Sequence, residues 1–599
     1  MATSVWAPDA QSVINAAKSS GAHPSPEDWR DQWIYFLMVD RFHNPAAPPV
    51  HAPFDDPDFY GFQGGKFSGV QQQLTYIRQL GAGAIWLSPV LRNFPFDPST
   101  YHGYGIHDFL HAEPRFADDP ARADEELRAL VDAAHAQGLY VILDIVLNHT
   151  GNAFAYQCDP GDVFCQIRQG AESSYHGMPQ PVLWRDETGA ARPDFTVIEA
   201  IPNAPRNALV WPAELQQNRF FRRQGDPQGG GDDTIGDFSV LKQMLTADPD
   251  LQRVLIRAYQ YVIARFDIDG FRIDTLRYLK GDLPRLFGNA MREFALSIGK
   301  KNFFTFGEVF DAQAEDDIAR FIGRNTGDAS ELVGVDAALD YPLYNSLKPI
   351  AKGFAPPSAV TTMYNHRKQV ERNVLSSHGD ATRYFVTFLD NHDVKERLRY
   401  VDPNDPHHYD DQVTLALGCL FSLPGIPCLY YGTEQGLHGR GSDPAVREAL
   451  WGGPGFDPQN PFYQAIHNIA GVRARRPALR YGRFYFRPVS GDGQTFGISP
   501  FSPGVLAFSR ILNDEEVLVV ANTSTDQGQS LEVIVDGQMS VPGASWQALY
   551  SNKLLPAQPS PVRQTGPVTV YEIDGSVGSG PLRTLRVSLQ PLEVQILAA

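Results

Sequence analysis

Over most of the chain, short apolar runs alternate with amphipathic stretches. In one such stretch Val70, Leu74 and Ile77 recur at helical spacing, and the stretch ends at Gly81, a typical helix stop. The apolar run 84–87 follows at once. Because it shows no polar alternation, it predicts a strand that is buried on both faces.

Eight runs of this kind predict eight strands with helices between them. Strands that alternate with helices form βαβ units and a parallel sheet, and eight such units close a (β/α)8 TIM barrel. We therefore predict an α/β fold built on this barrel. The predicted strands begin near Ile34, Ala84, Tyr140, Gly270, Phe303, Val333, Phe385 and Pro427.

Two regions depart from the barrel pattern. Residues 151–234, between the third and fourth strands, are rich in Gly, Pro, Asn and Asp and are too long for an ordinary loop, so they predict an inserted subdomain. After about Leu479, short alternating segments separated by turns predict a C-terminal antiparallel β-sandwich. The predicted domains are an N-terminal extension (1–30), the barrel in two parts (31–150 and 235–480), the inserted subdomain B (151–234) and the sandwich (481–599).

The net charge of −18 limits the partners. So acidic a chain repels nucleic acid and anionic membranes, whereas a neutral sugar is compatible with its field. The charge-free stretch from Gln412 to Thr433 is long enough to span a membrane, but Pro424 and Pro427 would break a helix there. We expect a buried helix, a turn and a buried strand, and no membrane partner. Oligomeric state stays open.

The four cysteines leave the compartment undetermined. Cys158 and Cys165 lie in a polar, turn-rich stretch, and the sequence favours neither a bridge nor free thiols there. Cys419 and Cys428 lie in an apolar stretch and are expected to be buried thiols. The first residues lack the apolar run of a signal peptide, and a cytoplasmic protein or a secreted one with its signal removed would both fit.

Polar residues gather at the predicted carboxyl ends of the barrel strands, where such barrels carry their chemistry. Asp274, Glu308 and Asp393 end three different strands, and Arg272 stands two residues before Asp274, on the same face of its strand. Glycoside hydrolysis needs one ionised and one protonated carboxyl group. Arg272 would keep Asp274 charged, and apolar and acidic neighbours would keep Glu308 protonated.

Four motifs at these strand ends carry a resemblance to the α-amylase family of retaining α-glucan enzymes. The resemblance covers nearly the whole chain and implies Asp274 as nucleophile and Glu308 as general acid/base. It implies that Asp393 binds sugar hydroxyls and stabilises the transition state. The motifs are Asp144-Ile-Val-Leu-Asn148-His149, Gly270-Phe-Arg272-Ile-Asp274, Gly307-Glu308 and Asn391-His392-Asp393.

Further substrate contacts follow from the same resemblance. Tyr104 would stack on the sugar ring before the scissile bond, and His102 would hydrogen-bond to that sugar. The remaining expected substrate-binding residues are Asp144, His149, Arg272 and His392.

The resemblance also implies a calcium ion. Asn148 would bind it together with Asp237, since calcium prefers oxygen ligands. The alternative is that Asn148 only bonds backbone and ties the insertion down. The chain departs from the family at Tyr278, where many calcium-dependent members carry His.

The expected activity is hydrolysis of α-1,4-glucosidic bonds in starch or maltooligosaccharides. Thr275, directly after the expected nucleophile, favours α-1,4 bonds because α-1,6-specific members tend to carry Val there. Transglycosylation through the same intermediate is the alternative. A remote alternative is a non-catalytic carbohydrate-binding relative, which predicts the loss of a carboxylate. Preferred chain length and endo or exo action stay open.

Overall fold

Eight parallel strands form the centre of the computed structural model, which describes residues 2–157, 178–194, 204–226, 234–313, 315–325, 332–371, 374–376 and 379–599. Cys158 and Cys165 lie outside these residues, so their pairing stays open. In sheet order the eight strands are β13 (Ala337–Ala338), β11 (Phe304–Gly307), β10 (Gly270–Asp274), β5 (Tyr140–Val146), β2 (Ala84–Leu87), β1 (Ile34–Leu37), β17 (Ile426–Tyr430) and β16 (Val386–Thr387).

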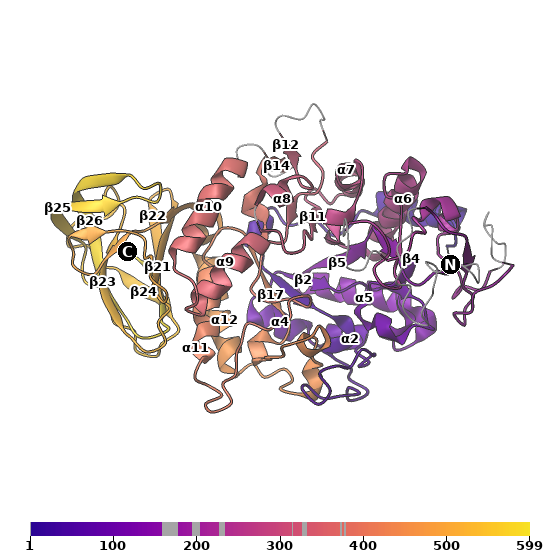
Figure 1. Ribbon diagram of the computed structural model, residues 1–599, viewed down its shortest axis with the longest axis horizontal. Coiled ribbons are helices and arrows are strands. Elements are labelled where there is room, and N and C mark those ends of the chain that lie inside the picture. The colour runs from indigo at the N-terminus through magenta and orange to yellow at the C-terminus, as the bar shows by residue number, and fades with distance from the viewer. Residues whose placement is uncertain are drawn as a thin grey trace.

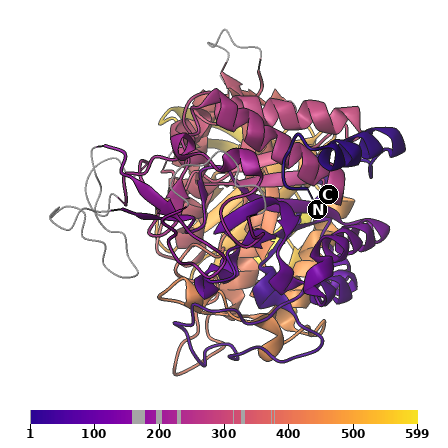
Figure 2. The ribbon, with the colours of Figure 1, turned by 90° about the vertical axis from the view of Figure 1, so that its right-hand side faces the viewer.

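A parallel bridge between Leu339 and Val386 joins the two ends of this sheet and closes the barrel. The predicted TIM barrel is therefore confirmed, with helices around the strands (Figures 1 and 2). The sixth strand, β13, begins at Ala337 rather than near Val333.

The helices begin and end largely where the sequence signals predict. Gly81 ends α4 with a left-handed backbone (φ 108°), and Asp248 caps α6 by accepting from the backbone N–H groups of Asp250 and Leu251. The helices are α1 (Pro8–Ser20), α2 (Val39–Phe42), α3 (Phe67–Gln72), α4 (Leu74–Leu80), α5 (Ala123–Ala136), α6 (Pro249–Phe266), α7 (Leu283–Ser297), α8 (Glu315–Ala319), α9 (Tyr341–Ala351), α10 (Ser358–Glu371), α11 (Asp410–Leu420), α12 (Pro461–Arg475) and α13 (Pro477–Tyr481).

The charge-free stretch forms a buried helix, α11, then a turn and the buried strand β17, as predicted. Cys419 and Cys428 on these elements are free and buried, which confirms their expected state. Within the described residues no helix is both long and apolar enough to cross a membrane.

Two five-stranded sheets follow the barrel and pack face to face as a sandwich (Figure 1, yellow end). Antiparallel pairing dominates as predicted, but Thr495 and Thr569 belong to a parallel pair, β20 with β25. The strands are β18 (Arg483–Phe486), β21 (Val505–Leu512), β22 (Glu515–Asn522), β27 (Val594–Ala598) and β24 (Gln547–Ser551) in one sheet, and β19 (Val489–Ser490), β23 (Gln529–Ile534), β26 (Val577–Leu589), β25 (Arg563–Tyr571) and β20 (Thr495–Phe496) in the other.

Short strands outside these sheets hold the loops around the barrel. The pair that matters most for the insertion is β6 with β9, in which His149 lies opposite Gln243. These strands are β3 (Leu91–Asn93), β4 (Ile106–Ala112), β6 (His149–Thr150), β7 (Phe154–Tyr156), β8 (Val182–Trp184), β9 (Lys242–Gln243), β12 (Arg324–Asn325), β14 (Val374–Ser376) and β15 (Gly379–Asp380).

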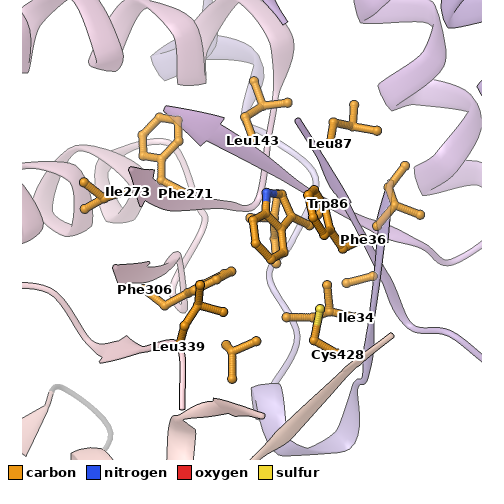
Figure 3. Packing of buried hydrophobic residues seen from close by; sticks show 14 of the residues in the cluster. Ile34, Phe36, Trp86, Leu87, Leu143, Phe271, Ile273, Phe306, Leu339 and Cys428 are labelled. Atoms are coloured by element: carbon orange, nitrogen blue, oxygen red, sulfur yellow. The ribbon is translucent and has the colours of Figure 1, made fainter. Parts of the chain in front are cut away.

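Buried aromatic and branched side chains pack against one another on the barrel strands (Figure 3). Trp86 stacks on Phe36 with ring centroids 3.8 Å apart and meets Phe306 edge-on at 5.5 Å. Its indole Nε1 donates to Asp144 Oδ2 at 3.2 Å. The Trp86 ring therefore packs in the core and also orients the carboxyl group of Asp144. Close packing here fixes the strand ends that carry the candidate site.

Candidate active site

Three neighbouring strands place three carboxyl groups around one buried guanidinium. Arg272 lies beside Asp144 of β5 and beside Phe306 of β11 in the strand register. Its Nη1 donates to Asp144 Oδ1 at 2.9 Å and to Asp274 Oδ1 at 3.0 Å, and its Nη2 lies 2.8 Å from Glu308 Oε1. The predicted Arg272–Asp274 pairing is present, and the same cation also contacts Glu308.

The backbone after β10 adds a second link between the carboxyl groups. Thr275 has a left-handed backbone, with φ of 50° and ψ of 39°, which is uncommon for a β-branched residue. In this conformation its N–H donates to Glu308 Oε2 at 3.3 Å. The strained residue after Asp274 thus orients the Glu308 carboxyl group, as strained positions at functional sites often do.

Burial raises the pKa values of two carboxyl groups of the site, Glu308 and Asp144. Glu308 is 4% exposed, and its loss of solvent raises its pKa to about 8, helped by the nearby carboxylates of Asp393, Asp274 and Asp144. Burial also raises the pKa of Asp144 to about 7, although Arg272 opposes this. Glu308 can therefore hold a proton at neutral pH, as a general acid must.

Tyr104 and His392 form a polar wall beside Asp144. The Tyr104 hydroxyl donates to Asp144 Oδ2 at 2.9 Å and lies 2.5 Å from His392 Nε2. The Tyr104 backbone N–H donates to His102 Nδ1 at 3.0 Å. Burial holds the pKa values of His102 and His392 well below the usual range, so both rings are neutral at neutral pH.

Asp393 reaches the site from the loop after β16. It is held by Arg447, whose Nη2 donates to Asp393 Oδ1 at 3.0 Å and whose Nε donates to the His392 carbonyl at 2.9 Å. Arg447 Nη1 also donates to the Tyr101 hydroxyl at 3.1 Å. The side chain of Asp393 stays 25% exposed and is the most open of the three predicted catalytic carboxyl groups.

Nδ1 of His392, a buried nitrogen near these groups, has no hydrogen-bond partner among the described residues. A buried polar atom without a partner is costly, so a ligand with hydroxyl groups would compensate for it. The motif residues are thus gathered where a sugar could bind.

Asn148 and Asp237, the residues predicted to bind calcium, lie close together, but the surroundings of their oxygens do not fit a calcium ion. Asp237 Oδ2 accepts from the Tyr156 hydroxyl at 2.7 Å and lies 3.3 Å from Lys242 Nζ. Asp237 Oδ1 accepts from the backbone N–H of Gln243 at 3.0 Å, and the side-chain Nε2 of Gln243 faces Asn148 Oδ1 at 3.5 Å. The oxygens that calcium would need already face an ammonium and N–H groups.

Two residues that support the site were not predicted from the sequence. Arg447 follows β17 in a loop that carries no strand or helix periodicity, and only the fold brings it to Asp393. Tyr341, at the start of α9, places its hydroxyl 3.5 Å from Glu308 Oε1. A Tyr that directly follows the sixth strand run was the available signal, since strand ends carry the chemistry in such barrels.

Known proteins resemble this chain over most of its length. The catalytic-domain model of the family described as alpha-amylase matches residues 36–459. An alpha-amylase from Streptomyces lividans is 27% identical over 79% of this chain and 52% of its own length. A cyclomaltodextrin glucanotransferase from Geobacillus stearothermophilus is 25% identical over 83% of this chain and 60% of its own length. The chain thus spans little more than half of these relatives.

Solved structures share the fold. The alpha-amylase of Geobacillus thermoleovorans, solved as a complex with acarbose, superposes with a TM-score of 0.61. It covers 96% of this chain and 99% of its own, at 23% sequence identity. At that identity the likeness concerns the arrangement of barrel and sandwich.

Proposed function

This chain belongs to the α-amylase family, and from that membership together with the site's geometry we propose that it is a retaining glycoside hydrolase. Its substrates are starch or maltooligosaccharides, in which it cleaves α-1,4-glucosidic bonds. The observation that carries the proposal is the shared contact of Asp274 and Glu308 with Arg272, combined with the raised pKa of Glu308. One ionised and one protonated carboxyl group on adjacent strands are what the reaction requires.

The proposed first step breaks the glycosidic bond. Asp274 Oδ attacks the anomeric carbon, while the proton on Glu308 passes to the departing glycosidic oxygen. The products of this step are a glucosyl ester on Asp274 and a released sugar chain with a free hydroxyl. The electron pair of the broken bond leaves with the glycosidic oxygen. In the second step ionised Glu308 takes a proton from water, the water oxygen attacks the anomeric carbon, and Asp274 is released.

The polar wall would hold the sugar during both steps. Asp393 and His392 offer an acceptor and a ring nitrogen to its hydroxyls, and Tyr104 offers an aromatic face to its C–H groups. Asp144 is bound to Arg272, Tyr104 and Trp86, so its role is to set the positions of the groups around it. His102 and His149 would complete the contacts to the same ring.

Calcium is not needed for either proposed step. The calcium ion that the family resemblance implies would lie between the insertion and the barrel, where it would stabilise the fold. Since the oxygens of Asn148 and Asp237 face protein donors, the proposal includes no metal.

A time course of products from soluble starch and from maltotriose tests the proposal. Hydrolysis predicts that free reducing ends rise with every bond broken. Transfer to a second sugar, the activity in the name of the glucanotransferase relative, would redistribute chain lengths with little gain in reducing ends. Binding of maltooligosaccharide without turnover would contradict both and would indicate a non-catalytic relative.

A further inference from the structure

A lysine and an aspartate form a completely buried ion pair where the insertion joins the barrel. Lys242 Nζ lies 3.3 Å from Asp237 Oδ2, and both side chains are 0% exposed. Removing two charges from water costs several kcal/mol per ion, so such a pair persists only with close contact and further hydrogen bonds. The surroundings supply both.

Two aromatic rings of β7 surround the ammonium. Lys242 Nζ lies 5.2 Å from the ring centre of Phe154 and 4.9 Å from that of Tyr156, within the range of cation–π attraction. The Tyr156 hydroxyl donates to Asp237 Oδ2 and accepts from the backbone N–H of Gly225 at 3.0 Å. The ammonium and its counter-ion therefore join β7 and β9 with the loop at Gly225.

Gln243, the next residue, ties the same junction together with its amide. Its Nε2 donates to the Thr234 carbonyl at 3.1 Å and faces Asn148 Oδ1 at 3.5 Å. Its Oε1 accepts from the Gly236 backbone N–H at 2.6 Å and from Arg222 Nε at 2.5 Å. One neutral side chain thus links Asn148, just after the third barrel strand, to Arg222 within the insertion and to residues 234–236 at its end.

The backbone holds these two side chains in place. Strand β9 pairs with β6 so that Lys242 lies opposite Thr150 and Gln243 lies opposite His149. Successive strand residues point to opposite faces. Lys242 therefore meets Asp237 and the rings of β7, while Gln243 meets Asn148.

We propose that Lys242 and Gln243 perform the joining role for which the sequence resemblance implied a calcium ion, so that the fold is stable without calcium. The ammonium of Lys242 neutralises Asp237, and the amide of Gln243 crosslinks the oxygens of Asn148 and Thr234. A divalent cation at this position would be repelled by the ammonium of Lys242. The oxygens of Asp237 and Asn148 that it would need as ligands already face that ammonium and the N–H group of Gln243. The assignment does not rest on the proposed enzymatic activity, because its readouts are stability and metal content.

Metal-stripped protein is the first test. After exhaustive treatment with a calcium chelator and removal of the chelator, we expect the Tm to equal that of untreated protein. Adding calcium ion at millimolar concentration should leave the Tm unchanged, since a ligand with no site on the native state cannot stabilise it. A Tm that falls on chelation and recovers with calcium, or about one calcium per chain by elemental analysis, would overturn the proposal.

Paired substitutions provide the second test. Lys242→Met keeps length and apolar volume but leaves Asp237 buried without its cation, and we expect the Tm to fall by about 5 °C or more. Asp237→Asn should also lower the Tm. The double variant should be more stable than the sum of the two single losses predicts, because the unpaired charge is gone. Purely additive losses would contradict the pairing.

Lys301→Met, at an exposed position away from the insertion, is the matched control and should leave the Tm almost unchanged. Limited proteolysis adds a local readout. In Lys242→Met we expect faster cleavage within the insertion than in the control, with the barrel cleaved at the control's rate. Equal cleavage of the insertion in both variants would count against a role at this junction.

Discussion

Arg447 donates a hydrogen bond to Asp393 across 3.0 Å and binds the carbonyl of the preceding residue, His392, at 2.9 Å. The guanidinium therefore fixes both the backbone and the carboxyl group of the most exposed of the three predicted catalytic acids. Arg447 itself is 8% exposed, and Tyr101 holds its remaining Nη. Asp393 thus receives its position from a residue that follows it by 54 places in the chain.

Arg447→Met should reduce kcat/KM through the position of Asp393. A displaced hydroxyl-binding group can cost up to about 100-fold, and we expect a loss of that order while the Tm changes by only a few degrees. Arg447→Lys should recover part of the activity. Combined with Asp393→Asn, the Met substitution should add little further loss. Fully additive losses would show that Arg447 acts elsewhere.

The raised pKa of Glu308 should set the alkaline limit of the proposed activity. An ordinary Glu ionises near pH 4.5, but the buried carboxyl group of Glu308 keeps its proton up to about pH 8. The acid form is the active one in the first step, so kcat/KM should fall as pH rises through about 8. A profile on maltooligosaccharide measures this, and an alkaline limb centred below about pH 6 would contradict the assignment.

Glu308→Gln separates acid help from nucleophilic attack. On starch we expect severe loss, because the departing sugar oxygen needs a proton. On glucosyl fluoride, whose leaving group needs less acid help, formation of the glucosyl ester should be partly retained. Full activity of this variant on starch would show that the proton comes from another group.

Asp274→Asn should abolish turnover while the fold stays intact. The amide has nearly the same shape but cannot form the ester, and loss of an attacking group can cost about 10⁴-fold or more in kcat. Circular dichroism and the Tm serve as controls for folding. Activity near the wild-type level would exclude Asp274 as the nucleophile.

Buried apolar runs made the barrel predictable, and the misplaced strand shows where that signal weakens. Strand β13 has two residues and pairs only at Ala337 and Ala338 with β11. Its apolar signal begins earlier, near the half-buried Val333, and continues through Val335, which is fully buried just before the strand. A run of apolar residues reports burial, whereas a strand boundary depends on which backbone groups find a partner.

The carboxyl groups of the site could be predicted because they follow buried strands. The carboxyl ends of parallel barrel strands all lie at the same end of the barrel, so side chains there come together. What the sequence could not reveal was how one side chain divides its contacts. Arg272 was expected to serve Asp274, and the fold shows that its second nitrogen contacts Glu308. Such sharing depends on the stagger of β10 and β11, which no periodicity encodes.

The calcium prediction depended on Asn148 and Asp237 alone. Lys242 stands five residues after Asp237 in a turn-rich stretch, and that spacing gives no reason to pair them. The two meet because the backbone turns back on itself between them, where Phe238 and Leu241 pair in antiparallel fashion. Contacts made across a hairpin of this kind require the register, which the composition of an insertion does not supply.

The stereochemistry of the product gives the most direct test of the mechanism. Asp274 and Glu308 end the adjacent strands β10 and β11, whose backbones run about 4.8 Å apart. Both carboxyl groups contact the single guanidinium of Arg272. We predict a separation of about 5–5.5 Å in the sugar complex, since an inverting enzyme needs about 6.5–9.5 Å to admit a water. Two displacements at the anomeric carbon then restore its configuration.

Proton NMR during the first minutes of maltooligosaccharide hydrolysis should therefore show the α-anomer before mutarotation mixes the two forms. The matched measurement is the spontaneous mutarotation rate under the same conditions, which sets how early the spectrum must be taken. A slowly reacting fluoro-sugar substrate should trap the glucosyl ester on Asp274. Detection of the modified peptide by mass spectrometry would support the same mechanism. Initial release of the β-anomer would mean that water attacks directly, and neither Asp274 as nucleophile nor the retaining assignment would survive it.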